Sequence, residues 1–234
     1  TFEAYGEDPW LVSRMGVANI QAIQSHDIIA MVKHYTVNNQ EQDRNVIDVQ
    51  VSDRALRELY LPPFEAAVRE AQVASVMCAY NSVNGSFSCE NEELLTTLLK
   101  EEWEFRGFVQ SDFGAMKSTV KAANAGMDLE MPAPRFYGAP LLAAVTAGEV
   151  AESRVDDMLA RRYSAMFRFG LFDNAPTLSP IPVEEHATMA REIGAAGSVL
   201  LRNEGSLLPL DTKKAMRIVL LGPWASKAAT GGGG

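Results

Sequence analysis

The stretch GFVQSDFGA, residues 107–115, decides the fold that we predict for this chain. It begins with a short apolar run of the kind that forms a strand buried on both faces. The run ends in polar and aromatic side chains at Ser111, Asp112 and Phe113. Strands buried on both faces belong to parallel sheets, in which helices connect one strand to the next.

Other segments repeat this order of strand, polar residues and helix. We expect three more strands, at residues 28–32, 74–79 and 127–131. The expected helices span residues 9–25, 54–71, 93–103, 115–125 and 140–169. The first three are indicated by capping residues, which are Asp8, then Ser52 or Asp53, then Asn91. The second is expected to be kinked or restarted at Pro62-Pro63. The fourth strand and the long last helix, broken near Gly148, close this part of the chain.

Strands that alternate with helices fit either an open doubly wound sheet or a (β/α)8 barrel. Ligands bind at the carboxyl ends of the strands in both architectures. No glycine-rich phosphate-binding motif follows any expected strand, so a nucleotide site has no support. The sequence therefore favours an α/β fold of the barrel type.

The composition of the sequence changes after residue 170. Residues 171–186 hold three prolines and no helical period, which indicates a linker. We expect residues 1–170 to form the C-terminal half of a (β/α)8 barrel. Residues 187–234 are expected to begin a second α/β unit, with a strand at 217–222 (RIVLLG).

Composition excludes several classes of protein. The 234 residues are 47% hydrophobic and carry a net charge of −9, which argues against binding of nucleic acid. No apolar run approaches the roughly 18 residues that a membrane span needs, so no membrane partner is expected. The two cysteines, Cys78 and Cys89, can pair or stay reduced, and the sequence leaves both states open.

Asp112 is the strongest candidate for chemistry. A carboxylate at the end of a buried strand lies where barrel enzymes place nucleophiles and bases, although an aspartate there can also cap the next helix. Lys33 and His34 lie just past the end of the strand at 28–32, where the backbone can bend and turn both side chains into one cavity. Two donors of this kind suit a hydroxyl-rich ligand. The alternative interpretation is that Lys33 forms an internal salt bridge and His34 is a core residue.

Aromatic residues near the strand ends suit a sugar ring. Tyr80 and Met77 can form a pocket wall, and Phe113 can offer a stacking face, although isolated aromatics are more often core. Four lone acids fit caps or ion pairs better than catalysis: Glu41, Asp43, Asp128 and Glu130. No cluster of metal-ligating residues occurs at ligand spacing, so neither a metal nor a cofactor is expected.

Together these segments resemble glycoside hydrolase family 3, the β-glucosidase and β-xylosidase group. The matching pieces, in family order, are residues 2–11, 32–41, 52–71, 75–85, 89–103, 107–115, 125–132 and 198–210. The resemblance implies a barrel joined by a linker to an α/β sandwich. It also implies that Asp112 is the catalytic nucleophile.

The same resemblance assigns substrate contacts. It implies that Lys33 and His34 bind sugar hydroxyls and that Met77 and Tyr80 line the pocket. Phe113 stands where many members have tryptophan. The family's substrate-binding arginine would fall before Thr1, and in the β-glucosidase branch the acid/base glutamate would follow Gly234, so we interpret the chain as an internal fragment.

The implied reaction is retaining, exo-acting hydrolysis of terminal β-D-glucosyl residues from a β-glucoside or oligosaccharide. A β-xylosidase, a glycoside phosphorylase of the same family and a carbohydrate-binding fragment without turnover are the alternatives. The N-acetylglucosaminidase branch is disfavoured because the loop TVNNQEQDR, residues 36–44, lacks a histidine. The site is expected to need flanking segments or a partner chain. The resemblance favours a periplasmic or secreted protein, but the residues of this sequence leave the compartment open.

Overall fold

The computed structural model places the chain in two units that divide between residues 177 and 178, inside the segment predicted as a linker. The described residues are 4–174, 177, 179–214 and 216–227. Parts of the predicted linker and both ends of the chain lie outside the described residues. Each unit is considered by itself below.

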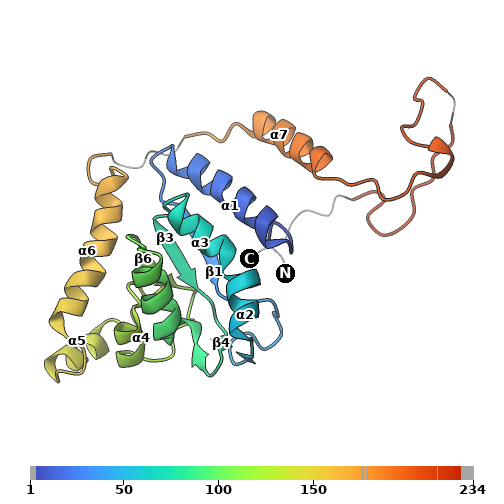
Figure 1. The fold of residues 1–234 in the computed structure, drawn as a ribbon. Coiled ribbons are helices and arrows are strands. Elements are labelled where there is room, and N and C mark those ends of the chain that lie inside the picture. The colour runs from blue at the N-terminus through green and yellow to red at the C-terminus, as the bar shows by residue number, and fades with distance from the viewer. Residues whose placement is uncertain (1–3, 175–176, 178, 215, 228–234) are drawn as a thin grey trace. The chain divides into compact units, whose positions relative to one another are not determined.

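A parallel sheet forms the centre of the first unit (Figure 1). Its strands are β1 (Met31–Tyr35), β3 (Ser75–Cys78) and β6 (Phe108–Ser111), in the order β1-β3-β6. Both pairings are parallel, and Leu129 adds a parallel bridge to Gln110 on the far side of β6. The α/β class predicted from the sequence is confirmed.

Helix α1 (Pro9–Gln24) begins and ends close to its predicted bounds. The Asp8 carboxylate accepts a 2.8 Å hydrogen bond from the backbone N–H of Leu11, and Pro9 occupies the first helical position, where a missing N–H costs nothing. Helix α1 packs against α3 (Pro62–Arg69) beside the sheet (Figure 1).

The predicted helix over 54–71 is divided where the sequence indicates. Ser52 caps α2 (Asp53–Ala55) by accepting a hydrogen bond from the N–H of Ala55. A π-helical turn, η1 (Leu56–Tyr60), follows, and α3 starts at Pro62 because proline cannot donate to the preceding turn.

The other helices of the first unit lie after β3 and β6. They are η3 (Glu93–Glu102), α4 (Val120–Ala125), α5 (Ala139–Thr146) and α6 (Glu152–Arg168). The predicted cap is confirmed at Asn91, whose side chain accepts from the N–H of Leu94. The predicted break near Gly148 is also confirmed, and this glycine has a φ of 75°.

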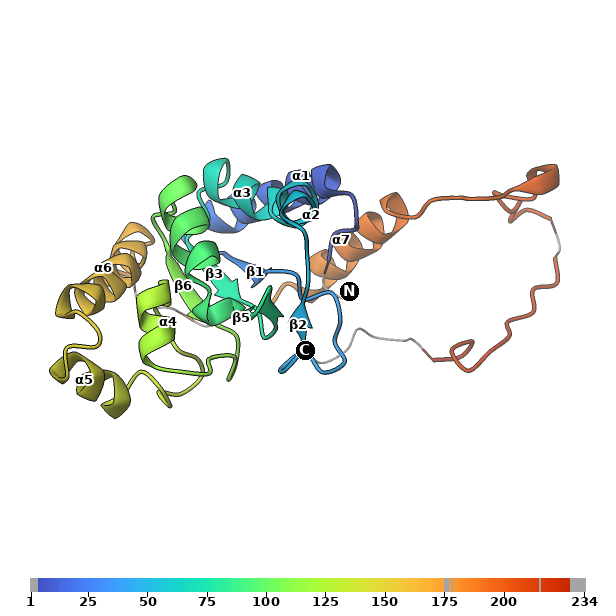
Figure 2. The same cartoon turned by 60° about the horizontal axis from the view of Figure 1, so that its bottom comes forward.

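A second, small sheet lies beside the carboxyl end of β3 (Figure 2). It contains β2 (Asp48–Val49), β4 (Ser82–Val83) and β5 (Ser86–Phe87), in the order β2-β4-β5. A 3-10 turn, η2 (Ser88–Glu90), follows β5 and leads into η3. The loop after β3 is therefore a folded structure rather than an open connection.

The first predicted strand was placed three residues too early. The apolar run starts at residue 28, but the ladder with β3 begins at the pair Met31 and Ser75. A strand is defined by its hydrogen-bonded partner, and β3 starts too late to pair with residues 28–30. Lys33 and His34 consequently lie within β1 rather than beyond its end.

Two further predictions in this unit were too long. The helix predicted over 115–125 forms only from Val120, because the backbone N–H groups of Gly114 and Lys117 bind Met131 O and the Glu90 carboxylate instead of preceding carbonyls. The strand predicted over 127–131 is reduced to the bridge at Leu129.

The second unit has little regular structure in its described residues. It contains α7 (Val183–Ala196) and a short turn, η4 (Glu204–Ser206). The strand predicted over 217–222 is wrong, because no described segment pairs with it, and residues such as Leu221 are exposed. Among the described residues of the whole chain, no helix combines the length and apolar character needed to cross a bilayer.

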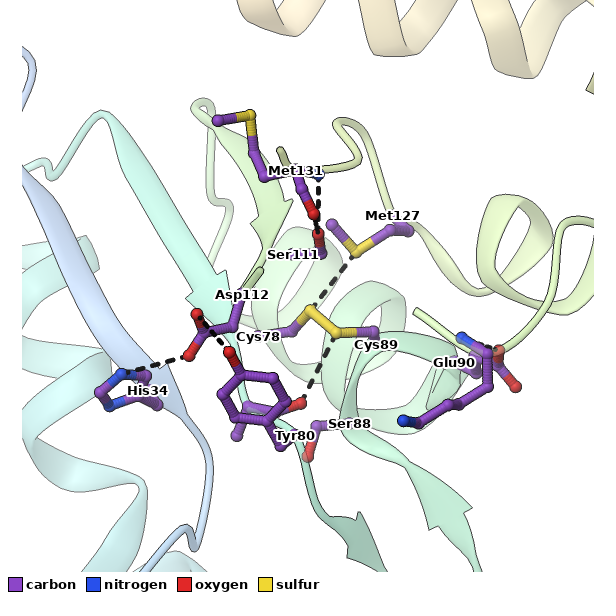
Figure 3. Close-up of a disulfide and its surroundings, with 12 residues drawn as sticks. His34, Cys78, Tyr80, Ser88, Cys89, Glu90, Ser111, Asp112, Met127 and Met131 are labelled. Atoms are coloured by element: carbon purple, nitrogen blue, oxygen red, sulfur yellow. Dashed lines mark hydrogen bonds and ion pairs between the residues drawn. A yellow bond between two sulfur atoms is a disulfide. The ribbon is translucent and has the colours of Figure 1, made fainter. Parts of the chain in front are cut away.

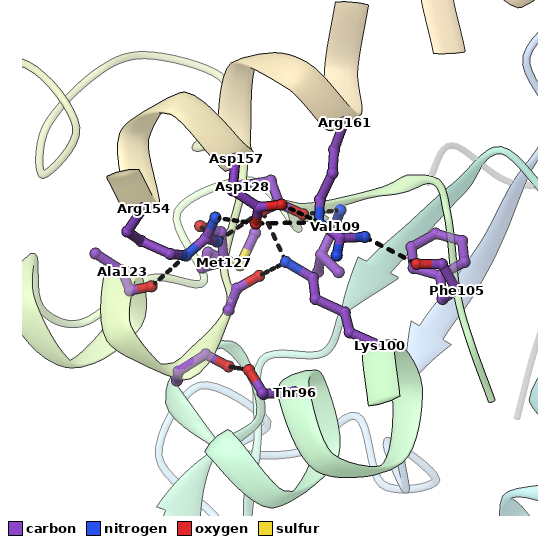
Figure 4. A network of polar contacts seen from close by, with 12 residues as sticks. Thr96, Lys100, Phe105, Val109, Ala123, Met127, Asp128, Arg154, Asp157 and Arg161 are labelled. Carbon is purple, nitrogen blue, oxygen red and sulfur yellow. Dashed lines mark hydrogen bonds and ion pairs between the residues drawn. The ribbon is translucent and has the colours of Figure 1, made fainter. Parts of the chain in front are cut away.

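A buried carboxylate links three elements of the first unit (Figure 4). The Asp128 side chain is fully buried and accepts from Lys100 Nζ at 2.8 Å, Arg154 Nη2 at 2.6 Å and the N–H of Val109 at 2.8 Å. Asp157 joins Arg154 to Arg161 in the same network. The network therefore connects η3, β6 and α6.

We expect Asp128→Asn to lower the free energy of unfolding by about 3 to 5 kcal/mol, because it leaves two largely buried cations without their anion. Urea unfolding of the chain measures the loss. The matched control is Asp156→Asn, an exposed position of α6 that should change stability by less than about 0.5 kcal/mol. Equal losses in the two variants would contradict the role given to Asp128.

Burial lowers the pKa of Lys100 from 10.5 to about 8, although the Asp128 carboxylate opposes the shift. Between these two pH values the unfolded chain keeps a proton that the folded chain has lost, so this group makes the free energy of unfolding rise with pH. Titration of the Lys100 13Cε resonance, assigned with Lys100→Arg, checks the value. A midpoint at or above 10.5 would refute it.

Candidate active site

The carboxyl ends of the parallel strands bring the candidate residues together. Asp112 directly follows β6, and its backbone N–H donates a 3.3 Å hydrogen bond to Cys78 O on β3. On the other side of β6, the N–H of Ser111 donates to Leu129 O. The main chain that carries Asp112 is thus held by both neighbours of its strand.

The Asp112 carboxylate is oriented by two donors and faces an imidazole (Figure 3). Its Oδ1 accepts from the N–H of Phe113 at 2.7 Å and from the Tyr80 hydroxyl at 3.1 Å. Its Oδ2 lies 3.4 Å from His34 Nε2. The side chains of Asp112 and His34 are 14% and 20% exposed, so both are sheltered yet still open to a small ligand.

Asp112 does not cap a helix. The next helix, α4, begins eight residues later and has Thr119 at its N-cap. The contact between the carboxylate and the N–H of Phe113 is local to the turn after β6. The alternative interpretation of Asp112 as a capping residue is therefore wrong.

A bulge in β1 explains how His34 comes to face Asp112. The register runs from the pair Val32–Val76 to the pair Tyr35–Cys78, so Lys33 and His34 together oppose Met77 alone. An extra residue interrupts the strict alternation of side chains along a strand. The sequence-based argument located this change beyond the end of the strand, whereas the structure places it inside β1.

Tyr80 lies in the turn after β3 and is nearly buried, with 9% exposure. Its single hydroxyl proton has two acceptors within reach, Asp112 Oδ1 and Phe113 O at 3.0 Å. Burial raises the pKa of this phenol, and the charge of Asp112 raises it further. The phenol therefore stays protonated and acts as a donor to the carboxylate.

The structure pairs Cys78 with Cys89, which the sequence left open. The disulfide joins the end of β3 to η2 and closes the segment that contains Tyr80. Within that segment, the N–H and hydroxyl of Ser88 both donate to Asn81 O, at 2.9 and 2.8 Å. The disulfide (Figure 3) and these two hydrogen bonds therefore close the turn that presents Tyr80.

The remaining candidates lie nearby but differ in exposure. Lys33 is exposed on β1, and Met77 is half-buried on β3. Phe113 is 59% exposed, so its ring is open for stacking next to Asp112. Sequence reasoning missed Arg44, whose guanidinium lies 4.5 Å from the centre of the Tyr80 ring. Its position in the polar loop after β1, on the side where barrel ligands bind, was the available signal.

Two of the four lone acids form the ion pairs predicted for them, and a third binds backbone N–H groups of a loop. Glu41 forms an ion pair with Arg44, and Asp128 belongs to the buried network. Glu130 accepts hydrogen bonds from the backbone N–H groups of Phe136 and Tyr137. These contacts leave Asp112 as the carboxylate that combines a strand-end position with a neighbouring imidazole and phenol.

A cavity of about 580 Å³ lies at the opposite ends of the strands. Its lining includes Ala74, just before β3, and Gly107, just before β6, and does not include Asp112. Position at the carboxyl ends and the chemistry of the side chains, rather than cavity volume, identify the candidate site.

The chain is similar to known proteins along most of its length. A family model described as the glycosyl hydrolase family 3 N terminal domain matches residues 1–164. The chain is 43% identical over 236 residues to a beta-glucosidase of Rhizobium radiobacter, covering all of this chain and 29% of that protein. It is 38% identical to beta-glucosidase B of Emericella nidulans, covering all of this chain and 28% of that protein.

Solved structures show the same similarity. Beta-glucosidase 3B from Thermotoga neapolitana, determined in complex with alpha-D-glucose, matches with a TM-score of 0.85 and 39% identity over 90% of this chain and 30% of its own. A beta-D-glucoside glucohydrolase from Trichoderma reesei matches with a TM-score of 0.83 and 40% identity, over 89% and 30%. The chain thus spans less than a third of the length of these relatives.

We expect replacement of both cysteines by alanine to lower the free energy of unfolding by about 3 kcal/mol, because the bond closes a loop with a sequence separation of 11 residues. Urea unfolding measures the change. Alkylation of the wild-type chain in denaturant without reductant should modify no thiol. Two modified cysteines in that experiment, or an unchanged unfolding midpoint in the variant, would contradict the pairing.

Proposed function

The chain belongs to glycosyl hydrolase family 3, and from this premise we propose that it carries the nucleophile of a retaining, exo-acting β-glucosidase. The observation that carries the proposal is the setting of Asp112, which is oriented by Tyr80 and the N–H of Phe113 and faces His34. The proposed substrates are terminal, non-reducing β-D-glucosyl residues.

In the proposed first step, Asp112 attacks the anomeric carbon while the bond to the leaving oxygen breaks, which gives a covalent glycosyl-enzyme. A second carboxyl group protonates the leaving oxygen. The second carboxylate then takes a proton from water as the water attacks the same carbon, which releases glucose and restores both carboxyl groups to their starting states. The two donors on Oδ1 fix the plane of the carboxylate, so Oδ2 is presented in one direction before the sugar arrives.

The other candidate residues receive binding roles. We assign Lys33 and His34 to the hydroxyl groups of the sugar, because an ammonium and an imidazole donate to such groups. Met77 and Tyr80 form the wall, and the exposed ring of Phe113 stacks on the sugar or its leaving group. The ring face and the donors suit a neutral pyranose.

The proposed domain arrangement follows the same premise. We propose a barrel portion over residues 1–170, a linker over 171–186 and the start of an α/β sandwich over 187–234. The division of the chain after residue 177 supports a boundary in this region. Because the proposed site needs flanking segments, substrate turnover is tested with the full reading frame around this chain.

Covalent labelling tests the role of Asp112. We expect 2,4-dinitrophenyl 2-deoxy-2-fluoro-β-D-glucoside to add one fluoroglucosyl group to the peptide that contains Asp112. Dinitrophenolate leaves without a general acid, so this reagent reports on the nucleophile alone. The fluorine slows hydrolysis of the adduct, and mass spectrometry of the digested protein then locates it.

Two variants sharpen this test. Asp112→Asn should abolish the label and reduce hydrolysis of p-nitrophenyl β-D-glucoside on the order of 10³-fold or more. Asp43 is a loop carboxylate, and Asp43→Asn should keep both the covalent label and the rate of hydrolysis. A label on another residue, or an unchanged rate in Asp112→Asn, would refute the assignment.

A further inference from the structure

Arg44 occupies an unusual position for a charged loop residue. Its guanidinium lies over the ring of Tyr80, with 4.5 Å from Cζ to the ring centre. Its Nη1 also donates to the Glu41 carboxylate at 2.7 Å, and the Arg44 side chain is 34% exposed. The guanidinium is thus held between an anion on one side and an aromatic face on the other.

Tyr80 connects this pair to the carboxylate of the candidate site. The ring that lies under Arg44 carries the hydroxyl that donates to Asp112 Oδ1 at 3.1 Å. The contacts therefore run without interruption from Glu41 through Arg44 and Tyr80 to Asp112.

The position of the ring sets the distance from the phenol oxygen to each of its two acceptors. The Tyr80 proton can go to Asp112 Oδ1 or to Phe113 O, which are almost equally distant. A small rotation of the ring would favour one acceptor over the other. A guanidinium stacked on the ring face opposes such rotation, because the attraction depends on the cation staying over the ring.

We propose that Arg44 is a positioning residue, which holds Tyr80 so that its hydroxyl serves the nucleophile Asp112, while Glu41 fixes Arg44. This inference rests on the function proposed above. Arg44 acts through Tyr80 and does not itself touch the reacting atoms.

The chain offers a matched control. Arg14 makes the same two kinds of contact as Arg44, since its Cζ lies 4.8 Å from the centre of the Trp10 ring and its guanidinium pairs with Glu70 at 2.6 Å. It belongs to α1 and has no contact with Tyr80 or Asp112 among the described residues. Arg14→Met therefore removes the same kind of contact at a place unrelated to the nucleophile.

A double-mutant cycle tests the proposal in the full reading frame. Methionine keeps much of the apolar stem of arginine and removes the charge, so Arg44→Met isolates the stacked cation. We expect Arg44→Met to lower kcat/KM for p-nitrophenyl β-D-glucoside about three- to tenfold, mainly through kcat. In the Tyr80→Phe background the same substitution should change kcat/KM less than about twofold, because the hydroxyl that Arg44 positions is absent.

Normalisation and controls separate positioning from folding. Rates are divided by the fraction of enzyme that the fluoroglucoside labels, so misfolded protein does not contribute. Arg14→Met should stay within about twofold of wild type. Arg44→Lys keeps a cation near the ring and should recover part of the loss.

Two results would overturn the proposal. One is an unchanged kcat/KM in Arg44→Met. The other is an equal loss in the wild-type and Tyr80→Phe backgrounds, which would show that Arg44 acts independently of the hydroxyl. Failure of the proposed function is distinguishable from both, because it would appear as absence of the label on Asp112 in the unmutated protein.

Discussion

The buried charge of Asp128 constrains how three elements of the first unit pack together. A carboxylate without solvent must be neutralised by partners within the protein, and here these are Lys100 and Arg154. The partners come from η3 and α6, and the second oxygen of Asp128 takes the N–H of Val109 in β6. The three elements must therefore pack so that all three donors reach Asp128. This requirement holds whatever net stability the ion pairs add.

This placement extends directly to the candidate site. Asp128 is followed by Leu129, whose N–H and carbonyl bind the main chain of β6 at Val109 and Ser111. Because β6 is also paired with β3, the residue after it is held from both sides. Asp112 thus emerges from a rigid strand end, while its partners arrive from the turn after β3 and the bulge in β1. Rigid strands that present loop-borne side chains are typical of sites at the carboxyl ends of parallel strands.

The sequence predicted local features well where local physics decides them. Asp8, Ser52 and Asn91 cap helices as expected, because a capping contact involves only neighbouring residues. It failed where distant partners compete for the backbone. Strand β1 starts at its pairing with β3, and the helix predicted from residue 115 is displaced because Met131 O and Glu90 bind the N–H groups that a helix would use.

The sequence by itself determined the α/β class, the helix caps and the position of Asp112 at the end of a buried strand, because these depend on hydrophobic pattern and short-range chemistry. Only the tertiary structure decided that His34 and Tyr80 contact that carboxylate, that Cys78 pairs with Cys89 and that Arg44 lies over Tyr80. Apart from the disulfide, these contacts join residues more than 30 positions apart, and their geometry follows from strand register, a bulge and a closed turn. No pattern confined to one segment contains that information.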